Sequence, residues 1–449
     1  MRKYIFLTAL SVPLLLITAC DKLLDLNPSQ NISENIALNS DENVKSVLIG
    51  AYSLFDDPGI YGGNILRNAE LLAGNGEILW TGTSDDPRQI FYKTMSSTNS
   101  DVLAQWVDSY EVINTCNNVL SALAVVKNDD RNRVEGEALF LRALMYFDLV
   151  RFFGLPYEAG KINNQPGVPI ILMPSRGIGK SSFVGRNTVE EVYNQVITDL
   201  KVAVAKLPEE NDVYASRGAA NALLARVYLQ KGDYDNARKA ANEVISSNQY
   251  TLITDYTNVF NQYYNTSEDI FATQIMPPES YNAMTVSFSI SYYGGNYGDI
   301  EIFESHLDLY PAGDRRKDLF FSGNGAMRCG KWNNLYGCVN LIRLAEMYLI
   351  RAESNIRIGT PYLGATPLDD YNTIHTRAGL TPSGSVTLND IILERRLELA
   401  FEGHRIHDIK RLKQNVATWT YNDPMLVFPI PAREIEANPT LKTQQNIGY

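Results

Sequence analysis

The sequence predicts a mainly α-helical fold, in which stacked helix pairs carry a large irregular region. Residues 135–153 provide the first observation, because from position 138 onward only Arg142, Asp148 and Arg151 interrupt the apolar run. A helix that is apolar around most of its circumference must be covered by other elements on several sides. No strand-like run lies beside it. The second observation is the spacing of small and large residues in 219–248, which is typical of two closely packed helices.

Composition limits the classes of partner. The chain has 449 residues, 45% of them hydrophobic, which is ample for a large core. Removal of Arg2 and Lys3 with a signal segment would leave 38 basic against 51 acidic residues, a net charge of −13. This charge argues against nucleic acid and polyanionic ligands. The chain has 26 Tyr against 16 Phe and 4 Trp, and tyrosine suits sugar rings and peptides, although most should pack between helices.

The N-terminus predicts export and a lipid anchor. Residues 1–19 have the three parts of a secretory signal peptide: basic residues, a short apolar run and small residues. Residues 16–20 also match a bacterial lipobox, whose cysteine, here Cys20, is lipidated and becomes the mature N-terminus. The alternative is an ordinary signal with a chance cysteine. A lipid on Cys20 would hold the protein at a membrane, since each buried methylene contributes about 0.8 kcal/mol.

Residues 20–449 are expected to form one domain, with 20–35 as a polar tether. A first amphipathic helix is predicted for 43–55 and is ended by an Asp-Asp-Pro-Gly turn. Residues 61–99 lack a clear period and are rich in Gly, Asn, Ser, Thr and Asp. Long irregular stretches inside a compact domain are often binding loops. The next helix, 102–126, should pack against 135–153.

Residues 161–187 form a connection punctuated by Pro and Gly. Its sequence around Lys180 resembles the end of a phosphate loop, but Pro174 occupies the position that requires Gly, and no strand precedes it. A phosphate loop is therefore rejected. Thr188 and Glu191 then predict a capping box at the start of a helix over 189–207.

The segment 219–248 matches the spacing of a tetratricopeptide helix pair. The matching residues are Ala225, Tyr228, Gly232, Tyr234, Ala237 and Ala241. One such pair cannot bury its own face, so other helices must stack on it. The candidates are 43–55, 135–153 with its preceding helix, and 341–358.

Residues 250–340 change in character. Segments 270–275 and 284–293 alternate enough to be short strands or extended loops. Cys329 and Cys338 bracket a loop and could form a disulfide worth roughly 2–3 kcal/mol, with two reduced thiols as the alternative. Cys116 is expected to be a buried small hydrophobe. Residues 391–412 predict a highly charged helix, and the Pro-rich C-terminal tail keeps apolar anchors that should fix it against the helices.

No catalytic, metal or cofactor site is predicted. The chain has no nucleophile elbow, no His-Glu-x-x-His and no complete dinucleotide or phosphate loop. His404 and His407 are close enough to share a metal, but no third ligand is evident at helical spacing. The acidic doublets Asp85-Asp86 and Asp369-Asp370 could serve a glycosidase only if set across a cleft. Doublets in polar loops are usually solvated, so a non-enzyme is favoured.

Together these residues resemble the SusD/RagB family of surface lipoproteins from Bacteroidetes nutrient-uptake systems. The resemblance is carried by the lipobox ending at Cys20 and by residues 136–142, 151–157, 341–346, 351–353, 394–405, 428–431 and 446–449. One departure is Ile406-His407, where the family usually has bulky aromatic residues. We expect this departure to alter local packing only.

The resemblance implies a scaffold of tetratricopeptide-like pairs, an irregular ligand-binding half, and no enzymatic activity. It also implies partnership with a SusC-like TonB-dependent transporter of the outer membrane, with the lipid-anchored chain facing the cell exterior. Members capture oligosaccharides or, in some branches, peptides. A protein-assembly scaffold of the tetratricopeptide type is a further alternative.

The family's binding residues vary with the ligand, so the candidates come from the irregular segments of this chain. Rings presented to solvent could stack on a pyranose, while amides hydrogen-bond its hydroxyls. The predicted ligand-binding residues are Asn75, Trp80, Tyr281, Asn282, Tyr292, Tyr293, Asn296, Tyr297 and Trp332. Any one of these rings could instead belong to a local loop core.

Overall fold

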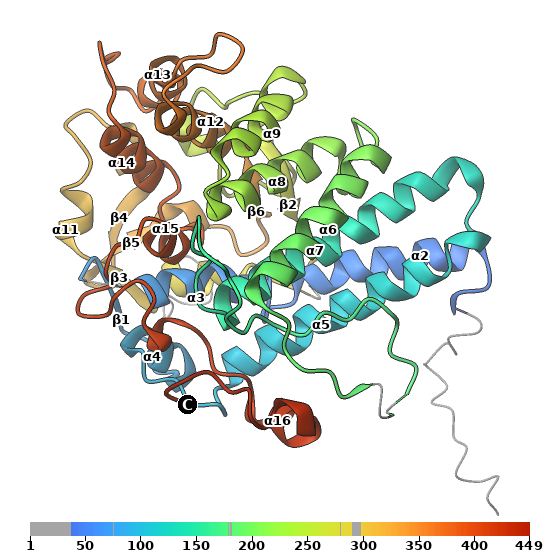
Figure 1. Ribbon diagram of the computed structural model, residues 1–449. Coiled ribbons are helices and arrows are strands. Elements are labelled where there is room, and N and C mark those ends of the chain that lie inside the picture. The colour runs from blue at the N-terminus through green and yellow to red at the C-terminus, as the bar shows by residue number, and fades with distance from the viewer. Residues whose placement is uncertain (1–36, 75, 178, 180–181, 279, 290–297) are drawn as a thin grey trace, which may run out of the picture.

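A stack of helices forms most of the molecule in the computed structural model, which describes residues 37–74, 76–177, 179, 182–278, 280–289 and 298–449 (Figure 1). Each helix of the stack packs on the stack member that follows it in sequence. The predicted helical scaffold is therefore confirmed. Its members are α2 (Asp41–Ser53), α5 (Ser100–Ser121), α6 (Asn128–Phe153), α7 (Val189–Lys206), α8 (Arg217–Lys231), α9 (Tyr234–Ser246), α12 (Leu344–Ile358), α13 (Pro367–Arg377) and α14 (Leu388–Glu398).

Helix α6 is the buried centre that the apolar run predicts. It packs between α5 and α7, and α2 also contacts it. Its buried charges are paired: the Arg142 guanidinium donates two hydrogen bonds of 2.8 Å to Asp199 on α7, and Arg151 pairs with Asp148. The helix begins at Asn128, one to two turns before the predicted start, because Asp129 and Asp130 favour a helical first turn.

The predicted helix pair is α8 and α9. Ala225, Ala237 and Ala241 are fully buried where the helices pack. Gly232 ends α8 in the left-handed conformation, with φ 72°, that glycine adopts without strain. The Thr188–Glu191 capping box at the start of α7 is likewise present.

Short elements form the irregular half. The helices are α3 (Asn64–Ala73), α4 (Asp85–Tyr92), α10 (Ala283–Phe288), α11 (Glu304–Leu307), α15 (Arg405–Arg411) and α16 (Ala432–Ala437). The strands are β1 (Ile78–Trp80), β2 (Asp269–Thr273), β3 (Ile300–Ile302), β4 (Phe320–Gly323), β5 (Ala326–Cys329) and β6 (Val339–Arg343). Among the described strands, one antiparallel sheet has the order β1-β3-β5-β4, and β2 pairs with β6.

Strand β1 pairs with β3, with Trp80 opposite Ile300. This pairing joins the two segments predicted to be irregular, 61–99 and 250–340. The first segment is more regular than predicted, because it contains α3 and α4 as well as β1. Of the short strand or extended loop predicted over 270–275, the structure has a strand, β2. The short strand or extended loop predicted over 284–293 is wrong at its start: Asn282 caps a helix there, and its side chain accepts a hydrogen bond from the Met284 N–H.

The helix predicted over 391–412 is broken into α14 and α15. Phe401 has φ 63° and Gly403 has φ 79°, so the chain leaves the helical path between them. Asp408 accepts a hydrogen bond of 2.6 Å from Arg411, three residues further along α15. Glu402, between the two helices, pairs with Arg343 and Lys331.

The structure has the second of the two alternatives for Cys329 and Cys338, reduced thiols and no disulfide. Cys329 and Cys338 are free thiols, as is the buried Cys116. Cys329 is fully buried, whereas the Cys338 thiol donates to the Tyr263 carbonyl and the Gln274 side chain at 3.3 Å, so the two sulfurs have separate surroundings. Residues 1–36, with Cys20 and the predicted signal and tether, lie outside the described residues. Among described helices, none is long and apolar enough to cross a membrane.

Candidate functional site

Two of the predicted ligand-binding rings belong to the core. Trp80 is 5% exposed, and its indole N–H donates to the Ser84 carbonyl at 3.2 Å. Trp332 is 1% exposed, and its indole N–H donates to the Phe401 carbonyl at 3.0 Å. Neither ring offers a face to a ligand in this structure, so their predicted binding role is wrong.

The remaining predicted residues divide into three groups. Asn282 is buried, where it caps α10 and its amide donates to the Gly337 carbonyl at 3.2 Å, which is a structural role. Tyr281, directly before Asn282, is 42% exposed, so its ring is accessible to a ligand. Five of the predicted residues lie outside the described part of the chain: Asn75, Tyr292, Tyr293, Asn296 and Tyr297.

The start of α10 packs against the start of α3, which places Tyr281 beside polar residues of the first irregular segment. The Ala283 N–H donates to the Gly62 carbonyl at 2.7 Å. Gly63 adopts φ 149°, and a Cβ built there would approach the Met284 nitrogen to 2.8 Å, so the contact requires a glycine. One turn into α3, the Arg67 guanidinium donates to Asp101 at 2.6 Å and to the Asn68 side chain at 2.9 Å.

Electrostatics show which groups surround this guanidinium. Burial lowers the pKa of Arg67, while the charges of Asp101, Asp299 and Asp86 and the Tyr281 hydroxyl act in the opposite direction. Burial also raises the pKa of Asp101 and of Asp299, and Arg67 counteracts this rise in both. We call this set the Arg67 face: Arg67, Thr81, Asp86, Asp101, Tyr281 and Asp299.

The Arg67 face combines an exposed ring with fixed polar groups. Thr81 is exposed and is held to the sheet by hydrogen bonds to the Asp299 carbonyl from its backbone at 2.7 Å and its hydroxyl at 3.0 Å. Carboxylates accept hydrogen bonds from sugar hydroxyls, and guanidinium groups donate to them. A ring face can cover the apolar surface of a sugar. Sequence analysis missed Arg67, Asp101 and Asp299, because isolated charged residues in polar segments carry no motif.

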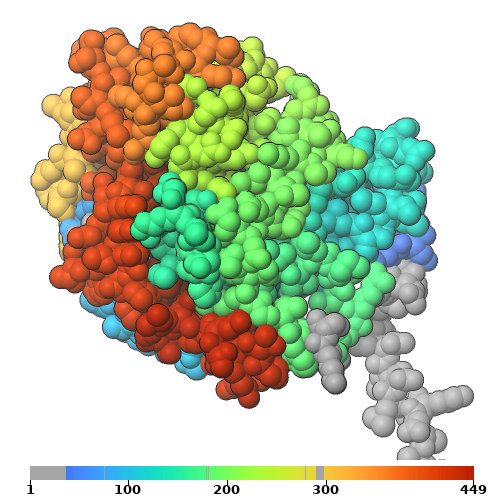
Figure 2. Space-filling model, viewed as in Figure 1, coloured from blue at the N-terminus to red at the C-terminus, as the bar shows by residue number. Residues whose placement is uncertain are grey.

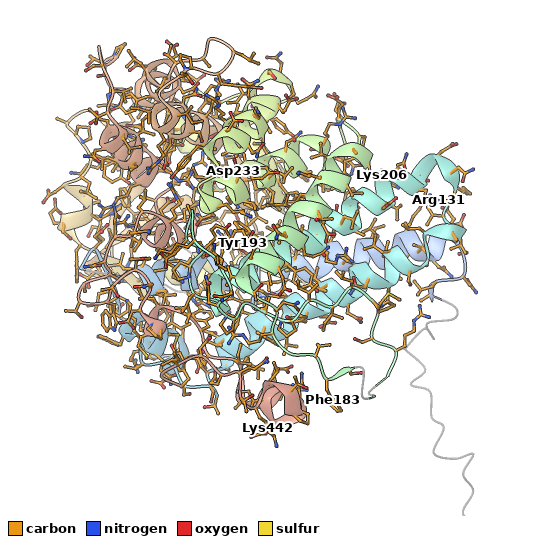
Figure 3. All side chains as sticks on the ribbon, in the orientation of Figure 1. Arg131, Phe183, Tyr193, Lys206, Asp233 and Lys442 are labelled. Carbon is orange, nitrogen blue, oxygen red and sulfur yellow. The ribbon has the colours of Figure 1, made fainter. Side chains whose placement is uncertain are left out.

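A second candidate is a groove of about 340 Å³ between α5, the 169–184 segment and the C-terminal residues. Trp106, Tyr110 and Phe183 supply its aromatic lining, with Glu434 and Asn438 as polar groups. Figure 3 shows Phe183 projecting beside α16. The groove is large enough for a small ligand but lies on α5 and the C-terminal tail, away from the paired irregular segments.

The described acidic and histidine side chains do not form a metal site. Within the described residues, no group of three or more His, Cys, Asp or Glu side chains could hold a metal ion. The acidic doublets have structural partners: Asp369 belongs to the capping box of α13, and Asp370 accepts hydrogen bonds of 2.9 and 2.6 Å from Arg351. Asp85 accepts from Gln89 at 2.7 Å, and Asp86 accepts from the Ser100 hydroxyl.

Two family models match the chain. One, described as "Starch-binding associating with outer membrane", matches residues 22–229, and one described as "SusD family" matches residues 326–426. Among proteins with a known description, SusD-like protein P2 of Formosa agariphila is 26% identical over 98% of each chain. The starch-binding protein SusD of Bacteroides thetaiotaomicron is 25% identical, with 71% of this chain and 73% of that protein covered.

A solved structure shares the fold. The crystal structure of a SusD superfamily protein from Bacteroides thetaiotaomicron aligns with a TM-score of 0.81 at 27% identity. The alignment covers 91% of this chain and 99% of that structure, so it includes both the helical stack and the irregular half.

Proposed function

Because the chain belongs to the SusD/RagB family, we propose that it captures oligosaccharides and delivers them to a SusC-like TonB-dependent transporter. The family is associated with the outer membrane. In this proposal, lipid attachment at Cys20 anchors the chain there, facing the cell exterior. The protein binds its ligand without chemical change, needs no cofactor, and hands it to the transporter.

The observation that carries the ligand proposal is the Arg67 face. Tyr281 is 42% exposed, and its hydroxyl is near enough to Arg67, the partner of Asp101, to act on the pKa of that guanidinium. Three carboxylates against one guanidinium make this face acidic, which favours neutral polyhydroxylated ligands over anionic ones. The five predicted residues outside the described ranges belong to the same two segments, and we propose that they add to the same site.

Calorimetric titration of purified protein with a panel of oligosaccharides and peptides tests the ligand class. We expect saturable binding to one class of oligosaccharide. The Tyr281→Ala variant should bind about tenfold more weakly, which corresponds to roughly 1.4 kcal/mol, because the ring face is lost. Tyr281→Phe should keep most of the affinity, since stacking does not require the hydroxyl.

Phe183→Ala is the matched control, because it truncates a partly exposed ring in the separate groove. Unchanged binding by Phe183→Ala, with an unchanged midpoint of thermal unfolding in all variants, supports the Arg67 face. Loss of binding in Phe183→Ala but not in Tyr281→Ala would place the ligand in the groove. Binding of peptides alone would favour the peptide-capturing branch of the family.

The anchor and the partner need separate measurements. Membrane fractionation should find the protein in the outer membrane and find Cys20→Ala released from it. Affinity purification should recover a large outer-membrane transporter with the wild-type chain. Recovery of soluble assembly factors in its place would favour the tetratricopeptide-type scaffold.

A further inference from the structure

Two carboxyl groups meet where the turn before α3 lies against α5. The Gly59 N–H donates to Asp57 Oδ1 at 2.8 Å, so the Asp57 carboxyl lies beside the backbone of this turn. A Cβ built on Gly59 would come within 1.8 Å of Asp108 Oδ2, which places the Asp108 carboxyl of α5 directly against the same glycine. The carboxyl groups of Asp57 and Asp108 are also hydrogen-bonded to each other.

This hydrogen bond requires a proton. Two ionised carboxylates offer acceptors but no donor, so the bond exists only while one of the pair is protonated. Burial and the neighbouring Asp57 raise the pKa of Asp108 to about 7, and Glu111, one turn along α5, acts in the same direction. No basic group in the described part of the chain counteracts this rise. Asp108 is therefore protonated in mildly acidic solution and ionised in alkaline solution.

The turn that carries Asp57 also holds the start of α10. The Asp57 carbonyl accepts from the Gly62 N–H at 2.9 Å, and the Gly62 carbonyl accepts from the Ala283 N–H at 2.7 Å. In addition, the Asp56 carboxyl is hydrogen-bonded to the side chain of Ser280. Both ends of the short segment between Ser280 and Ala283 are thus attached to this turn.

We propose that the Asp57–Asp108 pair is a proton-dependent latch, which holds the turn against α5 while it shares a proton and releases it when both carboxyls are charged. Release loosens the contact between Gly62 and Ala283, and with it the position of Tyr281. Because Tyr281 belongs to the Arg67 face, this regulation rests on the proposed function: the oligosaccharide is held more tightly in mildly acidic than in alkaline solution.

Hydrogen–deuterium exchange, followed by mass spectrometry of short peptides, tests the latch without any ligand. The reporters are the amides of Gly59, Gly62 and Ala283, whose hydrogen bonds depend on the turn. The pKa of Asp108 is about 7 in the latched state and the ordinary 3.8 after release. Protection of the reporters, corrected for intrinsic exchange, should therefore fall by about tenfold or more between pH 5.5 and 7.5. Protection of the buried amides of α8 should change far less.

One substitution removes the titrating group but keeps the hydrogen bond. Asp108→Asn supplies an amide that can donate to Asp57 at every pH, so its reporters should keep their protection at pH 7.5. Glu111→Gln is the matched control, because it neutralises an exposed acid on the same helix and leaves the pair intact. Its protection should fall as in the wild type. Glu70, whose pKa is also raised to about 7, titrates in all three proteins, so the difference belongs to Asp108.

An equal loss of protection in Asp108→Asn and the wild type would overturn the latch. A loss that α8 shares equally with the turn would overturn it as well, because the pair would then affect only global stability. If Asp108→Asn fails to fold, Asp57→Asn repeats the test: its amide can donate to the Asp108 carboxylate while its oxygen still accepts from Gly59. Since no ligand is involved, a latch that behaves as expected in a protein that binds no oligosaccharide would contradict the proposed function alone.

Discussion

Gly403 shows how a single residue decides the path of the chain between α14 and α15. Its φ of 79° lies in the left-handed region, and a Cβ built on it would come within 2.7 Å of Leu66 Cδ2 and 3.0 Å of Leu66 Cα. The same backbone turn lets the Gly403 N–H donate to Glu70 on α3. Only a residue without a side chain meets both conditions unstrained.

We therefore expect Gly403→Ala to lower the free energy of unfolding by about 1–3 kcal/mol, through backbone strain and the contact with Leu66. Urea denaturation of the purified variant measures this change. Gly384→Ala is the control, because a Cβ there would meet nothing within 4 Å and should leave stability nearly unchanged. Equal stability of the two variants would contradict the packing described for Gly403.

Residue chemistry alone separates ligand-binding rings from core rings poorly. Trp80 and Trp332 lie in segments that read as polar loops, yet both are buried by partners distant in sequence. Trp80 is covered because β1 pairs with β3, and Trp332 packs near Phe260. The neighbouring residues Tyr281 and Asn282 also differ: Asn282 is buried and caps α10, whereas Tyr281 is exposed. Such differences depend on tertiary pairing, which local composition does not encode.

At the scale of elements, local periodicity predicts helices well when their burial is uniform. The buried α6 and the closely packed α8 and α9 follow from apolar and small-residue spacing. Leu399, Ala400 and Glu402 favour a helix, yet α14 ends at Glu398. There Phe401 packs against Phe288, His306 and Phe320, and Glu402 pairs with Arg343. Tertiary contacts thus override helix propensity at this point.

The C-terminal tail is fixed against the helical stack, as its apolar residues predict. The Asn446 amide donates to the Phe153 carbonyl at the end of α6 and to the Phe428 carbonyl, at 2.8 and 2.7 Å. The Arg186 guanidinium donates to the Gln444 carbonyl at 2.7 Å and to the Asn446 side chain at 2.8 Å. In Figure 2 the C-terminal atoms, in red, lie against the green atoms of the connection that contains Arg186.

We expect Arg186→Gln to loosen the tail, because a shorter neutral side chain cannot reach the carbonyls of Phe153 and Gln444 together. Digestion with a carboxypeptidase, followed by mass spectrometry, should remove residues from the variant much faster than from the wild type. Arg433→Gln, which changes an exposed arginine on α16, should behave like the wild type. Equal protection in Arg186→Gln would show that apolar contacts alone hold the tail.

On the scale of the whole molecule, buried ion pairs connect distant parts of the irregular half to the stack. Arg343 at the end of β6 pairs with Glu268, Glu398 and Glu402, and it is 2% exposed. Arg377 on α13 pairs with Glu268 and Glu398 as well. Burying charges costs solvation, so each member depends on its partners, and removal of one leaves an uncompensated buried charge.

These pairs make the stability of the protein depend on carboxylate ionisation. Burial alone would raise the pKa of Glu398, but the charges of Arg377, Arg343 and Arg316 outweigh it and lower the pKa to about 2 from an ordinary 4.5. The pKa values of Glu402 and Glu353 are lowered in the same way, against burial, by Arg343 and Arg411 respectively. The folded state therefore binds fewer protons than the unfolded state between pH 4.5 and 2.

The free energy of unfolding should consequently fall as the pH decreases from 4.5 towards 2, because the unfolded chain gains the protons that the folded network excludes. For Glu398 alone the lowered pKa corresponds to roughly 3 kcal/mol, all of it present above pH 4.5 and lost near pH 2. The pKa values of Glu70 and Asp108 are raised to about 7 from ordinary values of 4.5 and 3.8, so these two groups act in the opposite direction. Their opposition ends once the pH lies below those ordinary values, because both groups are then protonated in the folded and the unfolded state.

Urea denaturation at steps of one pH unit from 5.5 to 2.5 measures this dependence. Repeating the series at about 0.5 M salt separates two causes, because salt screens repulsion between exposed charges but hardly affects buried pairs. The loss of stability should persist at high salt if the buried network causes it. Disappearance of the loss at high salt would instead assign the acid sensitivity to repulsion on the surface, and a stability independent of pH would contradict the ionised state of Glu398.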